Sequence, residues 1–146
     1  SADQPSSTPT VTNRTCAFHP RVGMAKTGDL LETRNDDPVM HNTHIFVGER
    51  TFLNVALVAG GKPVQKKVRS PGLMKVTCDA HPFMLGFVMV SAHGFVTTTD
   101  ALGKFSITCA QQGTHEISLW HETLGALKQQ ITVPPQGAVT VTIDYP

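Results

Sequence analysis

The chain has 146 residues and a nearly balanced charge, with 12 basic and 11 acidic side chains and a net charge of +1. Its hydrophobic content of 40% is ordinary for a globular protein and argues against global disorder. Lys66, Lys67 and Arg69 form the densest basic cluster, so a nucleic-acid partner has little electrostatic support. No apolar run approaches the roughly 18 to 20 residues that a membrane-spanning helix needs.

Short runs rich in Val, Ile, Thr and Phe dominate the chain and predict β-strands. The runs are Ile45–Val47, Leu53–Val58, Leu73–Thr77, Gly86–Val90, Phe105–Thr108, Glu116–Trp120 and Val139–Ile143. Turn signals such as Asp100-Ala101-Leu102-Gly103 separate them. Helical periodicity is weak, and only His121–Gln130 has room for one helical turn. The pattern predicts an all-β sandwich or barrel.

Composition divides the chain into three expected parts. Residues 1–10 are rich in Ser, Thr and Pro and predict a flexible leader. A seam near Ser91–His93 then separates a β domain at 11–92 from a C-terminal β extension at 93–146, in which we expect about four strands. No signal peptide is visible, and we expect the chain to be a mature form from which one has been removed.

The segment from Cys78 to Met84 places a thiol, the His81 imidazole and a thioether within seven residues. These soft or borderline donors suit copper better than magnesium or calcium. A trigonal copper–thiolate site also needs a second histidine, which usually comes from another strand. Either His41 or His44 could supply it, and because an extended strand points them to opposite faces, only one would face the metal.

Three cysteines are an odd number, so at most one disulfide can form within the chain. A Cys16–Cys78 disulfide would remove the thiolate that copper needs. Cys16 could otherwise be a core thiol or pair with Cys109, for which a buried free thiol is the default interpretation. We interpret the Cys-x-x-His spacing of Cys16 and His19 as coincidence.

These motifs together resemble the cupredoxins, the small type 1 blue copper proteins, of the amicyanin and plastocyanin type. The matching pieces are the loop Cys78-Asp79-Ala80-His81-Pro82-Phe83-Met84, the strand His41-Asn42-Thr43-His44-Ile45-Phe46, and the turns Thr27-Gly28-Asp29, Arg34-Asn35-Asp36 and Pro71-Gly72. The resemblance covers about Cys16–Val90 and implies a Greek-key β-sandwich with additional C-terminal antiparallel strands.

The resemblance also implies a site with one copper ion. Its ligands would be His41, Cys78, His81 and Met84. Asn42 would tie the histidine strand to the cysteine loop, Pro82 would stiffen that loop, and Phe83 would give it apolar cover.

The tail resembles a different module. Thr99-Asp100-Ala101-Leu102-Gly103-Lys104-Phe105-Ser106-Ile107 and Gly113-Thr114-His115-Glu116-Ile117 are similar to strands of carboxypeptidase-regulatory-like or transthyretin-like β modules. Such modules are usually structural or bind a partner, so the tail is expected to dock or orient the protein.

We therefore expect a one-electron carrier that relays electrons between redox proteins of the cell envelope and is not an enzyme. Its location would be periplasmic or otherwise extracytoplasmic, and its partners redox proteins or a membrane-bound electron-transfer complex. The alternative is a non-redox accessory or structural subunit with the same fold, with a Cys16–Cys78 disulfide in place of copper. A Cu(I) carrier would show clustered Met and His, and a copper enzyme would need an open coordination position; neither signature is evident.

Overall fold

The computed structural model describes residues 8–108 and 111–146, and the chain divides into two compact units. The first unit ends at Ile107 and the second begins at Thr108. Much of the predicted leader lies outside the described residues, and the first strand begins at Thr10. Among the described residues there is no helix long and apolar enough to cross a membrane.

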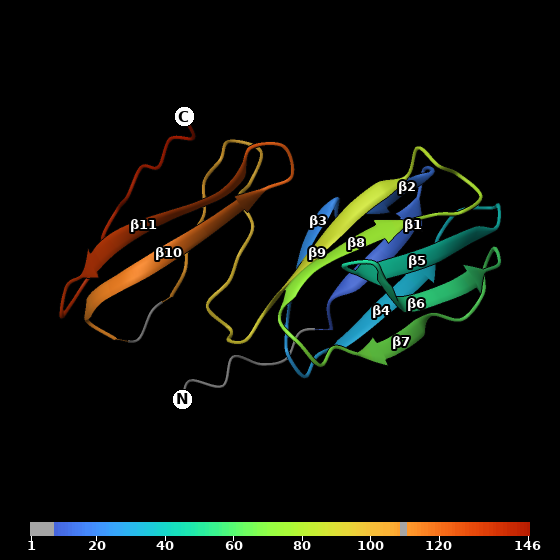
Figure 1. The fold of residues 1–146 in the computed structure, drawn as a ribbon, viewed down its shortest axis with the longest axis horizontal. Helices are drawn as coiled ribbons and strands as arrows, with labels where there is room; N and C mark the ends of the chain where they lie inside the picture. Colours follow the sequence, from blue (N-terminus) through green and yellow to red (C-terminus); the bar gives the residue numbers. More distant parts are fainter. Residues whose placement is uncertain (1–7, 109–110) are drawn as a thin grey trace. The chain divides into compact units, whose positions relative to one another are not determined.

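The described part of the first unit forms two sheets. Its strands are β1 (Thr10–Arg14), β2 (Ala17–His19), β3 (Val22–Lys26), β4 (Leu30–Asn35), β5 (His41–Val47), β6 (Arg50–Leu57), β7 (Val64–Lys67), β8 (Gly72–Thr77) and β9 (Leu85–Ser91). One sheet has the order β2-β1-β4-β7 and the other β3-β9-β8-β5-β6 (Figure 1). Both are mixed, because β1 pairs with β4 and β3 with β9 in parallel. The predicted all-β sandwich is confirmed.

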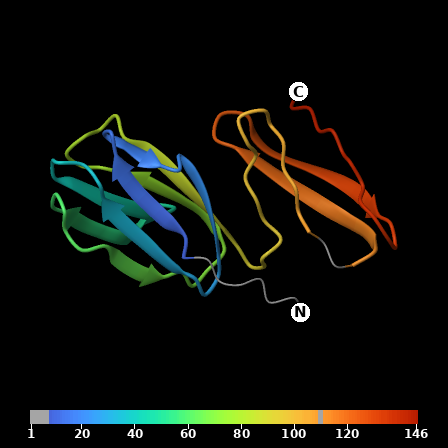
Figure 2. The same ribbon diagram turned by 180° about the vertical axis from the view of Figure 1, so that it is seen from behind.

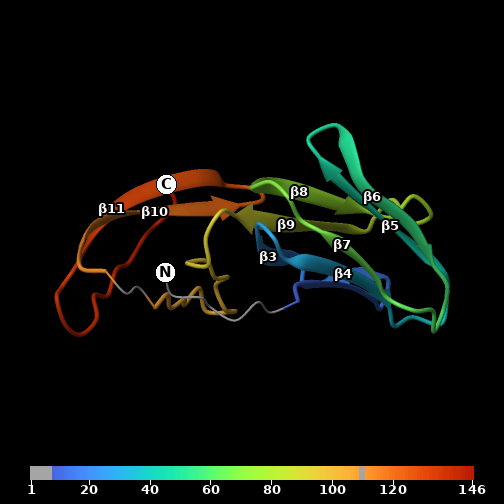
Figure 3. The same cartoon turned by 90° about the horizontal axis from the view of Figure 1, so that it is seen from below.

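The two sheets pack face to face around an apolar core. Figure 3 shows them in profile, with β8 and β9 on one side and β4 on the other. The four-stranded sheet, whose first strands are blue in Figure 2, contributes Val11, Phe18 and Leu31 to this core. Ile45 and Val76 face them from the other sheet. Each comes from a strand in which buried and more exposed residues alternate, as the two-residue period of a β-strand requires.

A buried polar bridge joins the two sheets at Thr43 of β5. Its Oγ1 accepts a hydrogen bond of 3.0 Å from the Asn13 side-chain amide on β1 and one of 2.9 Å from the Thr33 hydroxyl on β4. All three side chains are fully buried. Because Thr43 faces inward, its neighbours Asn42 and His44 face the outer side of the sheet.

The described part of the second unit contains one long hairpin, β10 (Gly113–His121) with β11 (Gly125–Val133). The strands pair without interruption from Gly113 opposite Val133 to His121 opposite Gly125. His121–Gln130, where the weak periodicity left room for at most one helical turn, lies mostly in β11.

Two expectations for the tail are wrong. Phe105–Thr108 and Val139–Ile143 form no strand, so β10 and β11 are the tail's strands among its described residues, where about four were expected. Val141 and Ile143 keep the predicted alternation and are half-buried, but they join no hydrogen-bonded ladder. An alternating sequence favours an extended chain, and a neighbouring strand must also be available. The predicted turn at Asp100 is present, and its carboxylate accepts the Leu102 and Lys104 amides at 2.9 Å.

We expect Thr43→Val to lower the free energy of unfolding by about 2 to 4 kcal/mol, because it leaves two buried donors without their acceptor. Thr43→Ser keeps the hydroxyl and should lose only about 1 kcal/mol for the missing methyl group. Urea unfolding of both variants measures the difference. Equal losses in the two variants would show that the hydrogen bonds of Thr43 add nothing to stability beyond side-chain packing.

Candidate metal centre

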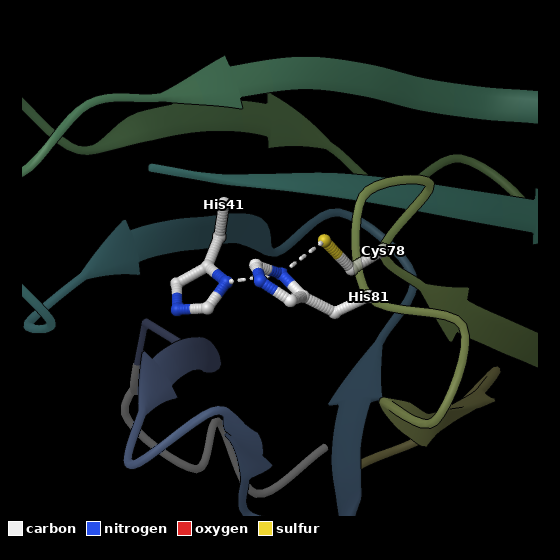
Figure 4. Close-up of side chains that lie close together, drawn as sticks. All are labelled: His41, Cys78 and His81. Atoms are coloured by element: carbon white, nitrogen blue, oxygen red, sulfur yellow. Dashed lines mark hydrogen bonds between the residues drawn. The ribbon is translucent and has the colours of Figure 1, made fainter. Parts of the chain in front are cut away.

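Three side chains predicted as ligands converge at one end of the sandwich. His41 begins β5, Cys78 directly follows β8, and His81 lies in the loop between β8 and β9. The Nδ1 atoms of the two histidines are 3.1 Å apart, and His81 Nδ1 is 3.5 Å from Cys78 Sγ (Figure 4). One donor atom from each residue lies within 4.8 Å of the others, so the group could hold a single metal ion.

His41 is held from its far side by Asp37. The Nε2 atom of its fully buried ring lies 2.7 Å from Asp37 Oδ2. An ionised carboxylate can only accept, so Nε2 carries the proton and donates it. In the neutral ring Nδ1 then keeps its lone pair, aimed at His81. The Asp37 carboxylate therefore selects the tautomer in which His41 can bind a metal.

Asp37 is in turn held by the two-residue turn between β1 and β2. Its Oδ1 accepts the Thr15 amide at 2.6 Å and its Oδ2 the Cys16 amide at 2.9 Å. Both turn residues have positive φ, 54° and 53°, which costs energy for any residue other than glycine and most for a β-branched one. Two charge-assisted bonds offset that cost.

The pKa of Asp37 is lowered from its ordinary value of 3.8. The hydrogen bond from the Cys16 amide is the largest cause, and burial opposes it by raising the pKa. The bonds from His41 and Thr15 lower it further. Asp37 is therefore ionised at neutral pH, as the tautomer argument requires.

Cys78 is buried, and its sulfur accepts a 3.4 Å hydrogen bond from the Asn42 amide. The Asn42 side chain spans to the next residue of the loop, donating to Asp79 Oδ2 at 3.1 Å and accepting the Asp79 amide. These contacts link the strand of His41 to the loop of Cys78.

The other loop residues lie nearer the surface. His81 is half-buried, and Pro82 is exposed. Phe83 is 69% exposed, with its ring centroid 5.6 Å from that of His81. The ring of Phe83 thus lies beside His81 on the surface, and the apolar cover expected from it stays a prediction.

The residues present fit a copper ion. Two ligands of one ion lie about 3 to 4 Å apart when each bond is 2.0 to 2.3 Å long, and the measured separations of 3.1 and 3.5 Å meet that condition. Two imidazoles and one thiol are the donor set of trigonal copper–thiolate sites. Met84 is buried in the same core cluster as Cys78, consistent with its predicted place beside the site.

His44 and Cys16 resolve two of the open alternatives. His44 faces outward from β5 and lies outside the converging group, and His41 is the histidine of this strand that converges with Cys78 and His81. Cys16 and Cys78 are both free thiols, the first exposed and the second buried, so the alternative disulfide between them is absent. Cys109, the other predicted partner of Cys16, lies outside the described residues.

Cys16, in the turn between β1 and β2, lies near polar side chains that the sequence did not indicate. The Cys16 sulfur lies within 4.8 Å of a carboxylate oxygen of Asp37 and a ring nitrogen of His41. His19, which shares its Cys-x-x-His spacing, instead contacts the Arg14 carbonyl at 3.0 Å. Asp37 is not predicted as a site residue from the sequence, because its only local signal is its place four residues before His41.

The sandwich of the first unit has the cupredoxin fold, as similar solved structures show. No protein-family model matches the chain, and no curated protein matches its sequence.

Three of the similar structures illustrate this likeness. The reduced state of one amicyanin mutant has a TM-score of 0.52 at 22% identity, over 62% of this chain and 88% of that one. A second reduced amicyanin mutant has a TM-score of 0.51 at 22% identity, over 56% and 80%. The copper-containing nitrite reductase of Thermus scotoductus SA-01 has a TM-score of 0.50 at 24% identity, over 56% of this chain but only 21% of its own. At these identities the likeness establishes the fold alone.

We expect Asp37→Ala to lower the free energy of unfolding of the metal-free protein by about 2 to 4 kcal/mol, because two turn amides and a buried imidazole N–H lose their acceptor. The adjacent Asp36 is the matched control. It pairs with Arg34 at 3.1 Å on the surface, and Asp36→Ala should cost no more than about 1 kcal/mol. Chemical denaturation measures the free energy of unfolding of both variants. Similar losses would contradict the stabilising role proposed for the Asp37 hydrogen bonds.

A pH dependence follows from the lowered pKa of Asp37. Since the folded pKa lies below 3.8, the unfolded chain binds this proton at a higher pH than the folded chain. The stabilisation is complete above the unfolded value and is lost as the pH falls through the folded value. Asp37→Asn should be less stable at pH 7 and should lose less stability on acidification. Urea unfolding of metal-free protein from pH 7 to pH 3 measures both slopes; parallel slopes would contradict this assignment.

Proposed function

We propose that the protein binds one copper ion at His41, Cys78 and His81, with Met84 as a weaker fourth ligand, and carries single electrons. The observation on which this rests is the convergence of two imidazole nitrogens and one buried thiol, with the first imidazole fixed by Asp37. Copper bound there would supply one-electron chemistry between its two common oxidation states. Carriage needs no substrate pocket, and we propose that the protein is not an enzyme.

The residues around the proposed ligands suit a site in which the copper ion changes its charge while its ligands stay in place. Asp37 orients His41 and keeps its inner nitrogen bare. The Asn42 amide donates a hydrogen bond to the Cys78 sulfur and so helps to hold it in place. Burial of His41 and Cys78 excludes water from their side of the site. Pro82 restricts the loop that carries His81 by fixing its own φ.

His81 is the proposed route for electrons. Of the three proposed ligands with converging donor atoms it is the one that is only half-buried, and the exposed Phe83 ring lies beside it. Met40 and Val39 precede His41 and are about half exposed. An apolar surface near a partly exposed ligand suits brief contact with a redox partner. We propose that this partner is a redox protein or membrane-bound complex of the cell envelope, and that the protein works outside the cytoplasm.

The C-terminal extension, residues 93–146, is proposed to dock or orient the protein. Its resemblance to carboxypeptidase-regulatory-like modules remains a prediction, as does its boundary between residues 92 and 93. The hairpin of β10 and β11 offers long strands with polar outward residues, including a 3.3 Å pair between Lys128 and Glu116. Such a surface suits a structural or partner-binding role.

Copper-loaded protein should contain one copper per chain and show an intense visible sulfur-to-copper charge-transfer band when oxidised. Cys78→Ser should abolish the band, because it removes the thiolate. Cys16→Ser is the matched control and should keep it, because Cys16 lies outside the proposed ligand set. Metal analysis and absorption spectroscopy measure these outcomes. A colourless protein with stoichiometric copper would contradict electron carriage, and one that binds no copper would favour the accessory-subunit alternative.

A further inference from the structure

A polar network on the outer face of the five-stranded sheet holds the ligand loop, and it centres on Asp79. This residue directly follows Cys78 and precedes His81 by two positions. Its side chain is 60% exposed, yet both carboxylate oxygens have partners. Oδ2 accepts from Asn42 at 3.1 Å, and Oδ1 lies 3.2 Å from His44 Nδ1.

His44 is itself fixed on two further sides. Its Nε2 lies 2.8 Å from the hydroxyl of Thr51 on β6. Its ring stacks on Phe46 with centroids 3.9 Å apart and an angle of 25° between the planes. Because a carboxylate only accepts, Nδ1 of His44 carries the proton that is donated to Asp79. In the neutral ring Nε2 then accepts from Thr51, so both ring nitrogens are satisfied.

The loop is also held by the Asn42 contacts with Cys78 and Asp79 and by bonds of its own backbone. Its own backbone bonds run from the His81 amide to the Cys78 carbonyl at 3.3 Å and from the Met84 amide to the His81 carbonyl at 3.0 Å. The first is long, so the peptide that follows Cys78 depends on side-chain contacts for its orientation.

We propose that His44 is a positioning residue for the metal centre, which acts through Asp79 to fix the loop that carries Cys78 and His81. The same strand then provides a ligand from its inner face, at His41, and the loop's support from its outer face, at Asn42 and His44. This inference extends the proposed function beyond its ligands, and it rests on that function only for the copper-loaded readout below.

The test compares two substitutions at His44 in metal-free protein. His44→Leu removes both ring nitrogens, whereas His44→Asn places an amide donor where Nδ1 was and so keeps the contact with Asp79. We expect amide hydrogen exchange at Asp79 and His81 to be about tenfold faster in His44→Leu, the change expected for a lost charge-assisted bond. It should return close to the original rate in His44→Asn.

Thr51→Val is the matched control, because it removes the other partner of the ring and leaves the Asp79 contact in place. It should leave loop exchange unchanged. In copper-loaded protein, His44→Leu should shift both the reduction potential and the charge-transfer band, and His44→Asn should restore them. Unchanged loop exchange in His44→Leu, with only a lower melting temperature, would make His44 a packing residue and overturn the proposal. Absence of a visible band in the unmodified protein would refute copper electron carriage, while the exchange experiment would still decide the role of His44.

Discussion

The hydrogen bond between the Asp37 carboxylate and His41 is the contact on which the metal end of the sandwich depends. One carboxylate receives the His41 ring from the five-stranded sheet and two amides from the turn of the other sheet. It thereby fixes the tautomer of a proposed ligand, supports a turn built from residues that disfavour positive φ, and links the two sheets by hydrogen bonds.

Strand β5 organises the site, because its inner and outer faces make different contacts. The inner face supplies His41 for the metal, Thr43 for the bridge to β1 and β4, and Ile45 for the core. The outer face supplies Asn42 and His44 for the ligand loop. A shift of one residue in the pairing of β5 would exchange these faces and lose all these contacts together. The register is thus fixed by polar contacts as well as by burial.

Much of the centre could be predicted from the sequence, because the thiol, the two imidazoles and the thioether occur in an order that local spacing makes visible. The opposite faces of His41 and His44 also follow from strand geometry. The roles of Asp37 and Asp79 could not be predicted in the same way. Asp37 depends on a turn more than twenty residues earlier in the chain, and Asp79 on a histidine 35 residues away.

The dependence on distant contacts also explains why the strands of the tail were not all predicted correctly. Val139–Ile143 has the alternation of a strand, but the described chain gives it no ladder. His121–Gln130 has room for one helical turn by its sequence, yet most of it pairs with β10 because a strand of matching length precedes it. The alternation of apolar and polar residues indicates which face of a segment is apolar. Whether the segment pairs in a sheet depends on which strand the tertiary structure places beside it.

The two ends of strand β9 lie at opposite ends of the first unit's sandwich. It begins at Leu85, next to the ligand loop, and ends at Ser91, whose carbonyl accepts the Thr27 amide at 2.8 Å. Seven extended residues span about 20 Å, so the chain leaves this strand far from the residues that would meet a redox partner. The residues that follow Ser91 therefore leave the sandwich at the opposite end of β9 from the loop of Cys78 and His81, and a substitution at this exit acts at a distance from that loop.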